Sequence, residues 1–574
     1  MKFFVNLLHF ELKFSKNMKT WFFPLAFIII SFFGGSFASA QSYPYSPPGS
    51  VLIFPDDDGK HTDLSTTTEW WYLNMHLIGS APLFKEYDVM LCYFSKPATM
   101  RIFNIADLVS GTFHTDVNQT PFVFSQQAGH WELTYNIPFQ ISDYSNWTHP
   151  TDNITFQYVF HAEEPVNDDG LDVTVTSNRY PLVVGGNGYI AIGGQGDSSY
   201  YYSYTNMKAE GTIRYNGVDD NITSGIAWID RQWGPFMVGI NSDNKYEWFC
   251  AQADKPNTTL GIPQTPSEFN IWQIFSDSTS VPYQPQWRTV SAIYADNTQD
   301  TSSSFFFERT GYWFDSANSV YYSNGWRFIE PDKGVNIDIT PKINNQVVNV
   351  TLFKFWEGGT ILQGTVNNLP VEGVGFAELV AAYDFQIILP SVPSGLTVGY
   401  YSDHYSISWT ASAQGTYPVG GYRIYRSANN DGYWQYIATT SNLFYNDYSV
   451  YPDSAYYYTV TSFDNQTATS ASNYATSVHA LPLGINSPDN QSGFLKIYPN
   501  PTSGKINVEF NKPLNEDFSV RIENVCGKTI LTNNFNKKSS KAGFEIDLSA
   551  CAKGVYFVKI IRESGVVLDK IMKE

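Results

Sequence analysis

The residues best suited to chemistry lie in the decapeptide IAWIDRQWGP, residues 226–235. This stretch combines two tryptophans with an acid, a cation and an amide, and a Gly-Pro pair ends it as it would end a strand. Because successive side chains of a strand point to opposite faces, Asp230 and Gln232 share one face, whereas Arg231 and Trp233 share the other. Two interpretations follow: an ion-paired folding motif with the tryptophans in the core, or a polar patch on the wall of an apolar cavity.

A second carboxylate stands among indoles in TEWWYLNMHL, residues 68–77. Glu69 directly precedes two tryptophans, and the alternating apolar residues after them predict a strand. A carboxylate in such surroundings is either ion-paired or held with a raised pKa. Arg231 is always charged and needs a partner if it leaves the surface, so we expect Glu69 and Arg231 to lie within ion-pair reach. Such pairing would lower the pKa of Glu69 and disqualify it as an acid at neutral pH.

Further candidate acids are Glu247 and Asp254 in YEWFCAQAD, residues 246–254. GVGFAELVAAYD, residues 373–384, closes the region with Glu378 in an apolar run. The stretch FPDDDGKHTD is rich in carboxylates, which suit a hard cation such as calcium, but it lacks the regular spacing of a calcium loop. We interpret it as an exposed acidic turn and assign no metal and no cofactor.

The elements that must position these residues are strands. The chain has 574 residues, of which 17% are aromatic, with Gly and Pro throughout and no long stretch of clean helical periodicity. These features predict an all-β protein of several domains. The net charge of −19 argues against nucleic acid and anionic membranes as partners. Four cysteines do not make a disulfide scaffold at this length. Cys92 and Cys250 are expected to be buried thiols, and a disulfide between Cys526 and Cys551 after export stays open.

Residues 1–40 are typical of an export signal. Lys19 gives a positive start after Met18, which is an alternative start of the chain, and residues 21–33 form an apolar core. Ala38-Ser39-Ala40 is a small-residue cleavage site. The apolar run is short for a membrane anchor, and no later run is long enough to span a bilayer. We therefore expect a soluble mature protein that begins at Gln41.

The stretches FPDDDGKH, TEWWYLNMHL, SYYYS, AWIDRQWG, YEWFCAQAD and GFAEL occur together in an order and spacing that resemble one family. It is the lipocalin-like family of secreted predicted hydrolases and carotenoid hydratases, which includes hydroxyneurosporene synthase and attachment-type proteins. The resemblance covers about residues 48–388 and implies two tandem lipocalin-like β-barrels or half-barrels, which we expect at residues 48–215 and 216–388. A small barrel can hold one apolar ligand. We place the Glu69–Arg231 pair at the junction of the barrels.

The resemblance implies a hydratase, in which a carboxylic acid protonates a double bond and aromatic residues stabilise the cation. The candidate catalytic residues are Asp230, Glu247 and Glu69. The candidate substrate-binding residues are Trp71, Tyr202, Arg231, Trp233 and Trp248. The substrate would be a small apolar molecule, isoprenoid-like or lipid-like. Secreted hydrolase is the family's other label, but no Gly-x-Ser-x-Gly elbow and no recognisable Cys-His pair support hydrolysis.

The second hypothesis is a non-catalytic extracellular binder of a lipophilic ligand. Many relatives carry His-Glu after the aspartate, where this chain has Arg231-Gln232. A fixed cation thus replaces a titrating imidazole, and this substitution favours the binder. How deeply the carboxyls of Asp230, Glu69 and Glu247 are buried distinguishes the hypotheses. A carboxyl inside a closed apolar cavity favours acid catalysis, whereas carboxyls all paired with Arg231 outside the cavity favour a structural role.

Two further modules follow the resemblance. Residues 394–480 resemble a fibronectin type III domain, with GYRIYRS and YYYTVTS as core strands. Residues 495–574 resemble the C-terminal sorting domain of the type IX secretion system, with YPNP and GVYF near its two ends. The resemblance implies the secretion machinery as a partner and a secreted or cell-surface location. The Pro-rich stretch 390–393 is expected to be an exposed linker, so that a chain ending near Asp384 should fold alone.

Processing at both ends is the first prediction. The mature protein should begin at Gln41, because a small-residue site precedes it, and should lose the sorting segment on secretion. Intact-mass spectrometry of protein recovered from the medium or cell surface measures both ends. Secreted protein that retains residues 495–574 would contradict the second half of this prediction.

Overall fold

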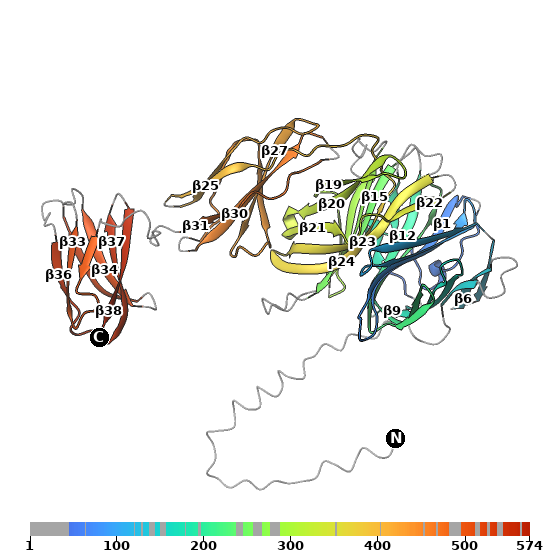
Figure 1. Ribbon diagram of the computed structural model, residues 1–574, viewed down its shortest axis with the longest axis horizontal. Helices are drawn as coiled ribbons and strands as arrows, with labels where there is room; N and C mark the ends of the chain where they lie inside the picture. The colour runs from blue at the N-terminus through green and yellow to red at the C-terminus, as the bar shows by residue number, and fades with distance from the viewer. Residues whose placement is uncertain are drawn as a thin grey trace, which may run out of the picture.

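Figure 1 shows the computed structural model, which is built almost entirely from strands. The structure describes residues 45–574 except for 64, 120, 128–129, 137–143, 150–155, 178, 193–196, 237–244, 256–266, 276–286, 295, 351–352, 402, 452–453, 467–468, 482–494, 511–516, 525–527, 537–542 and 563–564. The expected export signal and Cys526 therefore lie outside the described residues. Within the described residues there is no α-helix, and the all-β expectation is confirmed.

The first large sheet contains fourteen strands, in the order β4-β3-β2-β1-β14-β12-β9-β8-β7-β6-β5, with β10, β11 and β13 paired to β12. Its strands are β1 (Thr68–Ile78), β2 (Glu86–Lys96), β3 (Met100–Asp107), β4 (Thr112–Asn118), β5 (Phe122–Gln127), β6 (His130–Asn136), β7 (Tyr144–His149), β8 (Gln157–Glu164), β9 (Asp169–Thr176), β10 (Leu182–Val183), β11 (Tyr189–Ala191), β12 (Ser198–Tyr215), β13 (Val218–Asn221) and β14 (Ser224–Gly234). All of its pairings are antiparallel, and β1 joins β14 across most of the domain's sequence.

The second large sheet contains ten strands, in the order β18-β17-β16-β15-β24-β23-β21-β20-β19, with β22 paired to β23. Its strands are β15 (Lys245–Lys255), β16 (Ser267–Phe275), β17 (Arg288–Tyr294), β18 (Gln299–Ser302), β19 (Phe306–Asp315), β20 (Val320–Glu330), β21 (Val335–Pro341), β22 (Val347–Val350), β23 (Phe353–Val366) and β24 (Leu369–Leu379). The division between the sheets falls after β14, later than the expected division at residues 215 and 216. Both sheets are half-barrels, because their hydrogen-bonded order runs from one edge strand to another.

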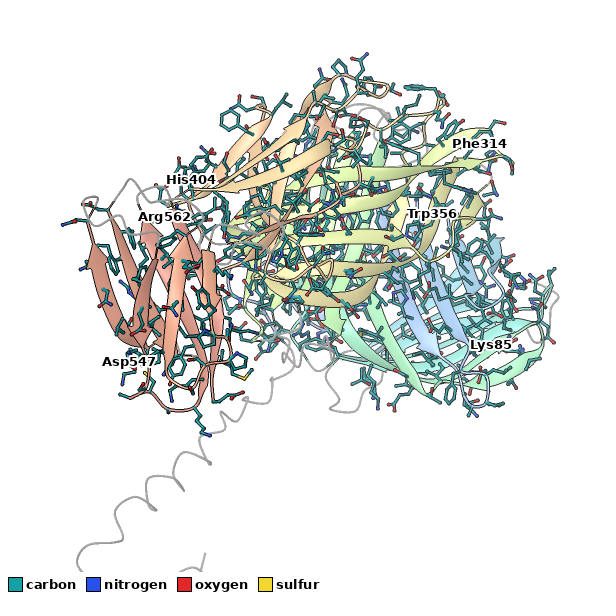
Figure 2. All side chains as sticks on the ribbon, turned by 60° about the vertical axis from the view of Figure 1, so that its left-hand side comes forward. Lys85, Phe314, Trp356, His404, Asp547 and Arg562 are labelled. Atoms are coloured by element: carbon teal, nitrogen blue, oxygen red, sulfur yellow. The ribbon has the colours of Figure 1, made fainter. Side chains whose placement is uncertain are left out.

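The central strands are buried on both faces. On β1 the odd-numbered residues pack into the core enclosed by the first sheet, whereas the even-numbered ones face the second sheet. On β15 the same alternation separates the core of the second sheet from residues that face the first. We call the shared layer the inter-sheet layer. Trp356, labelled in Figure 2, lies in the core of the second sheet rather than in this layer.

The interior of the first half-barrel is filled by the chain itself. The short 3-10 helix η1 (Asp56–Asp58) carries Asp58 into it, where this side chain is buried. The hydroxyl of Tyr158 donates a hydrogen bond to Asp58 over 2.7 Å, and Tyr202 and Tyr204 donate to the same carboxylate. The expectation of an exposed acidic turn is therefore wrong at Asp58, because three tyrosine hydroxyls satisfy its oxygens inside the core.

The region expected to be fibronectin-like forms two facing sheets. One contains β25 (Ser394–Tyr400), β26 (Tyr405–Thr410) and β29 (Phe444–Asp447); the other contains β27 (Val419–Ser427), β28 (Gln435–Thr440), β30 (Tyr456–Asp464) and β31 (Val478–Ala480). The sorting segment likewise forms two sheets, one of β32 (Leu495–Tyr498), β33 (Lys505–Phe510) and β36 (Gly543–Asp547), and one of β34 (Phe518–Asn524), β35 (Thr529–Phe535), β37 (Gly554–Arg562) and β38 (Gly565–Lys573). The fibronectin assignment itself stays a prediction.

The module of β25–β31 is docked firmly on the second half-barrel. Arg423 pairs with Glu308 over 2.6 Å with both side chains buried, and its guanidinium lies 3.8 Å from the centre of the Phe306 ring. The backbone of Arg309 on edge strand β19 exchanges hydrogen bonds with Thr469 and Ala471. The module thus covers a sheet edge that would otherwise expose unpaired backbone groups.

The expected linker at residues 390–393 is not a free hinge. Pro390 and Pro393 are buried whereas Ser391 and Val392 are exposed; Ser391 exchanges hydrogen bonds with Ala413 and accepts one from Ser462. Independent folding of a chain ending near Asp384 stays a prediction, and such a truncation would remove the cover from β19 and from the buried Glu308.

Truncation tests this interface. A chain ending near Asp384 should melt at a lower temperature and aggregate, whereas one ending at residue 481 should melt like the full chain. In the full chain, Arg423→Met should lower the free energy of unfolding by about 3–5 kcal/mol, because it leaves Glu308 buried without its cation. Equal melting of both truncated chains would contradict this role of the module.

Candidate active site between the two large sheets

Strand register arranges the first sheet's contribution to the inter-sheet layer as two rows. Each row runs across β1, β14 and β12 on one face: Trp70, Gln232 and Tyr201 form the first, and Tyr72, Asp230 and Ser203 form the second. The second sheet contributes one row to the same layer. It runs across β23, β24, β15 and β16 and consists of Glu357, Glu378, Trp248 and Trp272. Acids and aromatic rings from distant parts of the chain therefore meet in one buried layer.

A small cavity of about 50 Å³ lies in this layer. Its lining is apolar apart from two carboxyls and two phenols, and consists of Trp70, Tyr72, Met90, Cys92, Phe94, Ile102, Tyr246, Phe353, Phe355, Glu357 and Glu378. Strands β1, β2 and β3 supply one wall, and β15, β23 and β24 supply the other. The aromatic faces and the two acids thus line the same pocket.

Glu357 and Glu378 lie directly opposite each other on β23 and β24. Tyr72 donates a hydrogen bond to Glu357 over 2.7 Å, and Tyr246 donates one to Glu378 over 2.6 Å. Burial raises the pKa of both carboxyls; the charge of Glu378 raises that of Glu357 further, and the pKa of Glu378 lies at about 7. No lysine or arginine among the described residues forms an ion pair with either acid. Two close carboxyls without a cation cannot both ionise, so the pair retains a proton at neutral pH.

Asp230 lies in the same layer but outside the cavity lining. It accepts hydrogen bonds from the Tyr201 hydroxyl (2.6 Å), the Ser203 hydroxyl (2.5 Å) and the Trp228 indole (2.6 Å). Burial raises the pKa of Asp230 to about 7 against the effect of these hydrogen bonds. The predicted separation of Asp230 from Arg231 onto opposite strand faces is confirmed. Asp230 borders Tyr72 in the strand register and so sits one strand from the cavity wall.

Glu69 and Arg231 form the expected ion pair, with 2.7 Å between Glu69 Oε1 and an Arg231 terminal nitrogen. Burial alone would raise the pKa of Glu69, but the charge of Arg231 and hydrogen bonds from His61 and Ser95 lower it to about 2. The pair does not lie at the junction of the half-barrels. It faces the interior of the first one, where the Arg231 guanidinium packs 3.9 Å from the centre of the Trp71 ring.

Glu247 is also placed away from the cavity. It pairs with Arg309 over 2.5 Å in the core of the second sheet and accepts a hydrogen bond from Ser323. Of the expected substrate-binding residues, Trp71, Tyr202, Arg231 and Trp233 all point into the filled interior of the first half-barrel. Trp248 alone faces the inter-sheet layer. The side chain of Asp254 lies outside what the structure describes.

Sequence reasoning missed Glu357, Tyr72 and Tyr246. The sequence feature that could have revealed them is an acid or a phenol on the strand face that meets the other sheet, as for Glu357 in FKFWEGG. Glu378 gave the same signal as an acid in an apolar run, but no motif linked the two strands. Within the described part of the chain, no cluster of three or more His, Cys, Asp or Glu side chains is placed to hold a metal ion.

Comparison with known proteins agrees with this architecture. Residues 45–383 match the AttH-like family, and residues 496–574 match the secretion system C-terminal sorting domain. Kievitone hydratase of Fusarium solani subsp. phaseoli is 23% identical over 356 residues, which is 59% of this chain and 91% of that protein.

Two solved structures are also similar. An AttH protein of Nitrosomonas europaea is 22% identical with a TM-score of 0.45, covering 60% of this chain and all of that one. Kievitone hydratase of Nectria haematococca is 18% identical with a TM-score of 0.43, covering 59% of this chain and 98% of that one. The sorting domain indicates type IX secretion to the cell surface or the extracellular space, and hence interaction with that machinery. No helix among the described residues is both long and apolar enough to cross a membrane.

The ion pair of Glu69 predicts a stability effect. Glu69→Gln should lower the free energy of unfolding by about 3–5 kcal/mol, because it leaves Arg231 buried without a carboxylate. Since the folded pKa of Glu69 is lowered to about 2, its contribution should be present above pH 4.5 and lost as the pH falls towards 2. Urea unfolding at several pH values measures both effects. Asp57→Asn, which alters a more exposed partner of His61, is the control and should change stability little.

Proposed function

Because the chain belongs to the AttH-like family, we propose that it is a secreted hydratase that adds water to a carbon–carbon double bond of an apolar substrate. The observation that carries this proposal is the Glu357–Glu378 pair, which lies in an apolar, aromatic-lined cavity and forms no ion pair with a cation among the described residues. The relative from Fusarium is a kievitone hydratase, which supports the same reaction class.

Two routes of hydration differ in the sign of the charge that develops on the substrate, and the cavity wall suits only one of them. Conjugate addition of water would build negative charge on the substrate and would need a cation or N–H donors to stabilise it. The described cavity wall contains acids, phenols and aromatic faces instead. Aromatic faces and a newly formed carboxylate both stabilise positive charge. The site therefore favours direct protonation of an electron-rich alkene.

In the proposed reaction the protonated member of the Glu357–Glu378 pair gives its proton to one alkene carbon. The resulting carbocation lies against the rings that line the cavity, of which Trp70 and Phe355 belong to opposite walls. A water oxygen then bonds to the cation, and the ionised member of the pair takes the water's proton. The substrate has gained one water, and transfer of the proton between the two glutamates resets the pair.

A non-catalytic binder of a lipophilic ligand is the second candidate. The mostly apolar lining of the cavity favours it, since such a lining suits retention of an apolar group without any reaction. The two candidates differ in outcome, because a binder returns its ligand unchanged.

Product mass tests the proposal. Purified protein incubated with kievitone, or with a lipid extract of the source cells, should yield a product heavier by one water, and heavy-oxygen water should label it. In deuterated water the product should carry one deuterium on carbon. Recovery of bound but unaltered compounds would support the binder and contradict the hydratase.

Substitution of the acid pair should remove turnover while leaving the fold intact. Glu357→Gln and Glu378→Gln should each lower kcat by roughly 100-fold or more, in the range that general acid catalysis contributes. Glu372→Gln is the matched control, since Glu372 lies on the same strand but bonds to Tyr433 outside the cavity. Equal activity of Glu378→Gln and Glu372→Gln would show that the pair is not the acid.

The pH dependence follows from the retained proton. Because burial raises the pKa of Glu378 to about 7 and the charge of Glu378 raises the pKa of Glu357 further, the pair loses its first proton near pH 7 and its last one at higher pH. The reaction needs one protonated and one ionised glutamate, so kcat/KM should rise as the pH rises through about 7 and Glu378 becomes able to take the water's proton. A limb near pH 7 that persists unchanged in Glu378→Gln would assign the titration to another group, of which Asp230 is the nearest candidate.

A further inference from the structure

The side chain of Gln232 is fully buried on β14, yet neither its carboxamide nitrogen nor its oxygen has a hydrogen-bond partner among the described residues. A buried polar group without a partner is costly, so this amide gains free energy by meeting the polar atom of a ligand.

Gln232 faces the second sheet in the inter-sheet layer. Its neighbours in the same row are Trp70 on β1, which lines the cavity, and Tyr201 on β12. Two contacts between the sheets bracket this position: Tyr201 packs on Trp272 with 6.0 Å between ring centres, and Tyr72 packs on Trp248 with 5.4 Å. Gln232 is thus buried on the strand face that meets the aromatic residues of the second sheet, beside the cavity residue Trp70.

Trp248 on that wall carries a second unpartnered donor. Its indole nitrogen is buried and has no hydrogen-bond partner in the described chain. In the register of the second sheet Trp248 stands directly beside Glu378, which in turn stands beside Glu357. Neighbouring strands lie about 4.8 Å apart, so this donor is about one strand away from the acid pair.

The two half-barrels repeat one arrangement at this place. Each begins its layer-facing wall with a Glu-Trp pair, Glu69-Trp70 on β1 and Glu247-Trp248 on β15. The residue opposite the tryptophan is Gln232 in the first sheet and Glu378 in the second. Equivalent positions thus hold a neutral amide on one wall and a proton-retaining acid on the other.

We propose that Gln232 and the Trp248 indole form a polar subsite that binds a hydroxyl or carbonyl oxygen of the substrate, several bonds away from the alkene that the acid pair protonates. The inference rests on the proposed function, since it assigns the other end of the same substrate. An amide offers one donor direction and one acceptor direction to such an oxygen, and the indole offers a second donor. The subsite selects oxygenated apolar molecules over pure hydrocarbons, because a hydrocarbon leaves these groups unpaired.

Matched ligands test the subsite without any need for turnover. Farnesol and farnesene share an isoprenoid chain with double bonds and differ in the hydroxyl, and quenching of tryptophan fluorescence reports their binding to the full chain. The wild-type protein should bind farnesol at least tenfold more tightly than farnesene. Gln232→Met, which keeps the side-chain length, should reduce the ratio of the two affinities at least tenfold. Its affinity for farnesene should be unchanged.

Stability provides the check on folding. Gln232→Met should melt at the same temperature or higher, because it removes two unsatisfied polar atoms. Asn104→Leu is the matched control: Asn104 is a buried amide on the same sheet, with both polar atoms likewise unpartnered among described residues, but on β3, three strands from Gln232. It should leave the farnesol preference unchanged.

Three results would overturn the subsite. They are the absence of a farnesol preference in the wild-type protein, including binding of neither probe; an unchanged preference in Gln232→Met; and equal weakening of both ligands, which would show that Gln232 does not act on the hydroxyl. Failure of the protein to hydrate any substrate would contradict the proposed function alone, because the preference is measured by binding.

Discussion

Burial on both faces is the constraint on which this structure depends. The central strands of the two large sheets have a core on one side and the opposing sheet on the other, so nearly every residue of β1 and β16 is buried. A charge on such a strand must be paired or must give up its charge. Both solutions occur here. Glu69 and Glu247 face the half-barrel interiors and are paired with arginines, and Asp88 on the layer-facing side of β2 is paired with Lys342. Asp230, Glu357 and Glu378 in the layer between the sheets form no ion pair among the described residues, and burial raises their pKa values instead.

That contrast explains why the interiors and the inter-sheet layer have different uses. Paired acids such as Glu69 are locked in their ionised form and serve the fold. Acids that keep a proton in an apolar layer are able to give it to a substrate, and here they lie where two sheets from distant parts of the chain meet. The aromatic content, which a lipocalin-like interior would use for a ligand, instead fills the first half-barrel around Asp58. The proposed chemistry therefore belongs between the half-barrels rather than inside either one.

The module of β25–β31 likewise covers a surface that would otherwise be exposed. An open sheet ends in edge strands, and β19 is covered by backbone hydrogen bonds from residues 469–471, with Glu308 and Arg423 paired beneath. The module thus packs against the edge of the second sheet and is not joined to it by a linker alone. The sorting domain that follows addresses the protein for export, and its own two sheets enclose a separate core.

The sequence by itself determined the strands, their all-β class and the parity of their side chains, because alternation along a strand is local and survives any tertiary arrangement. It separated Asp230 from Arg231 correctly and paired Glu69 with Arg231, since a buried guanidinium demands a carboxylate. Only the tertiary structure decided which face meets which neighbour. Glu357 and Glu378 are adjacent through the pairing of β23 with β24. Glu357 meets Tyr72, 285 residues away along the chain, only because the second sheet covers the first. No local pattern specifies such a contact, so Glu247 and Tyr202 looked as suitable as the residues that line the cavity.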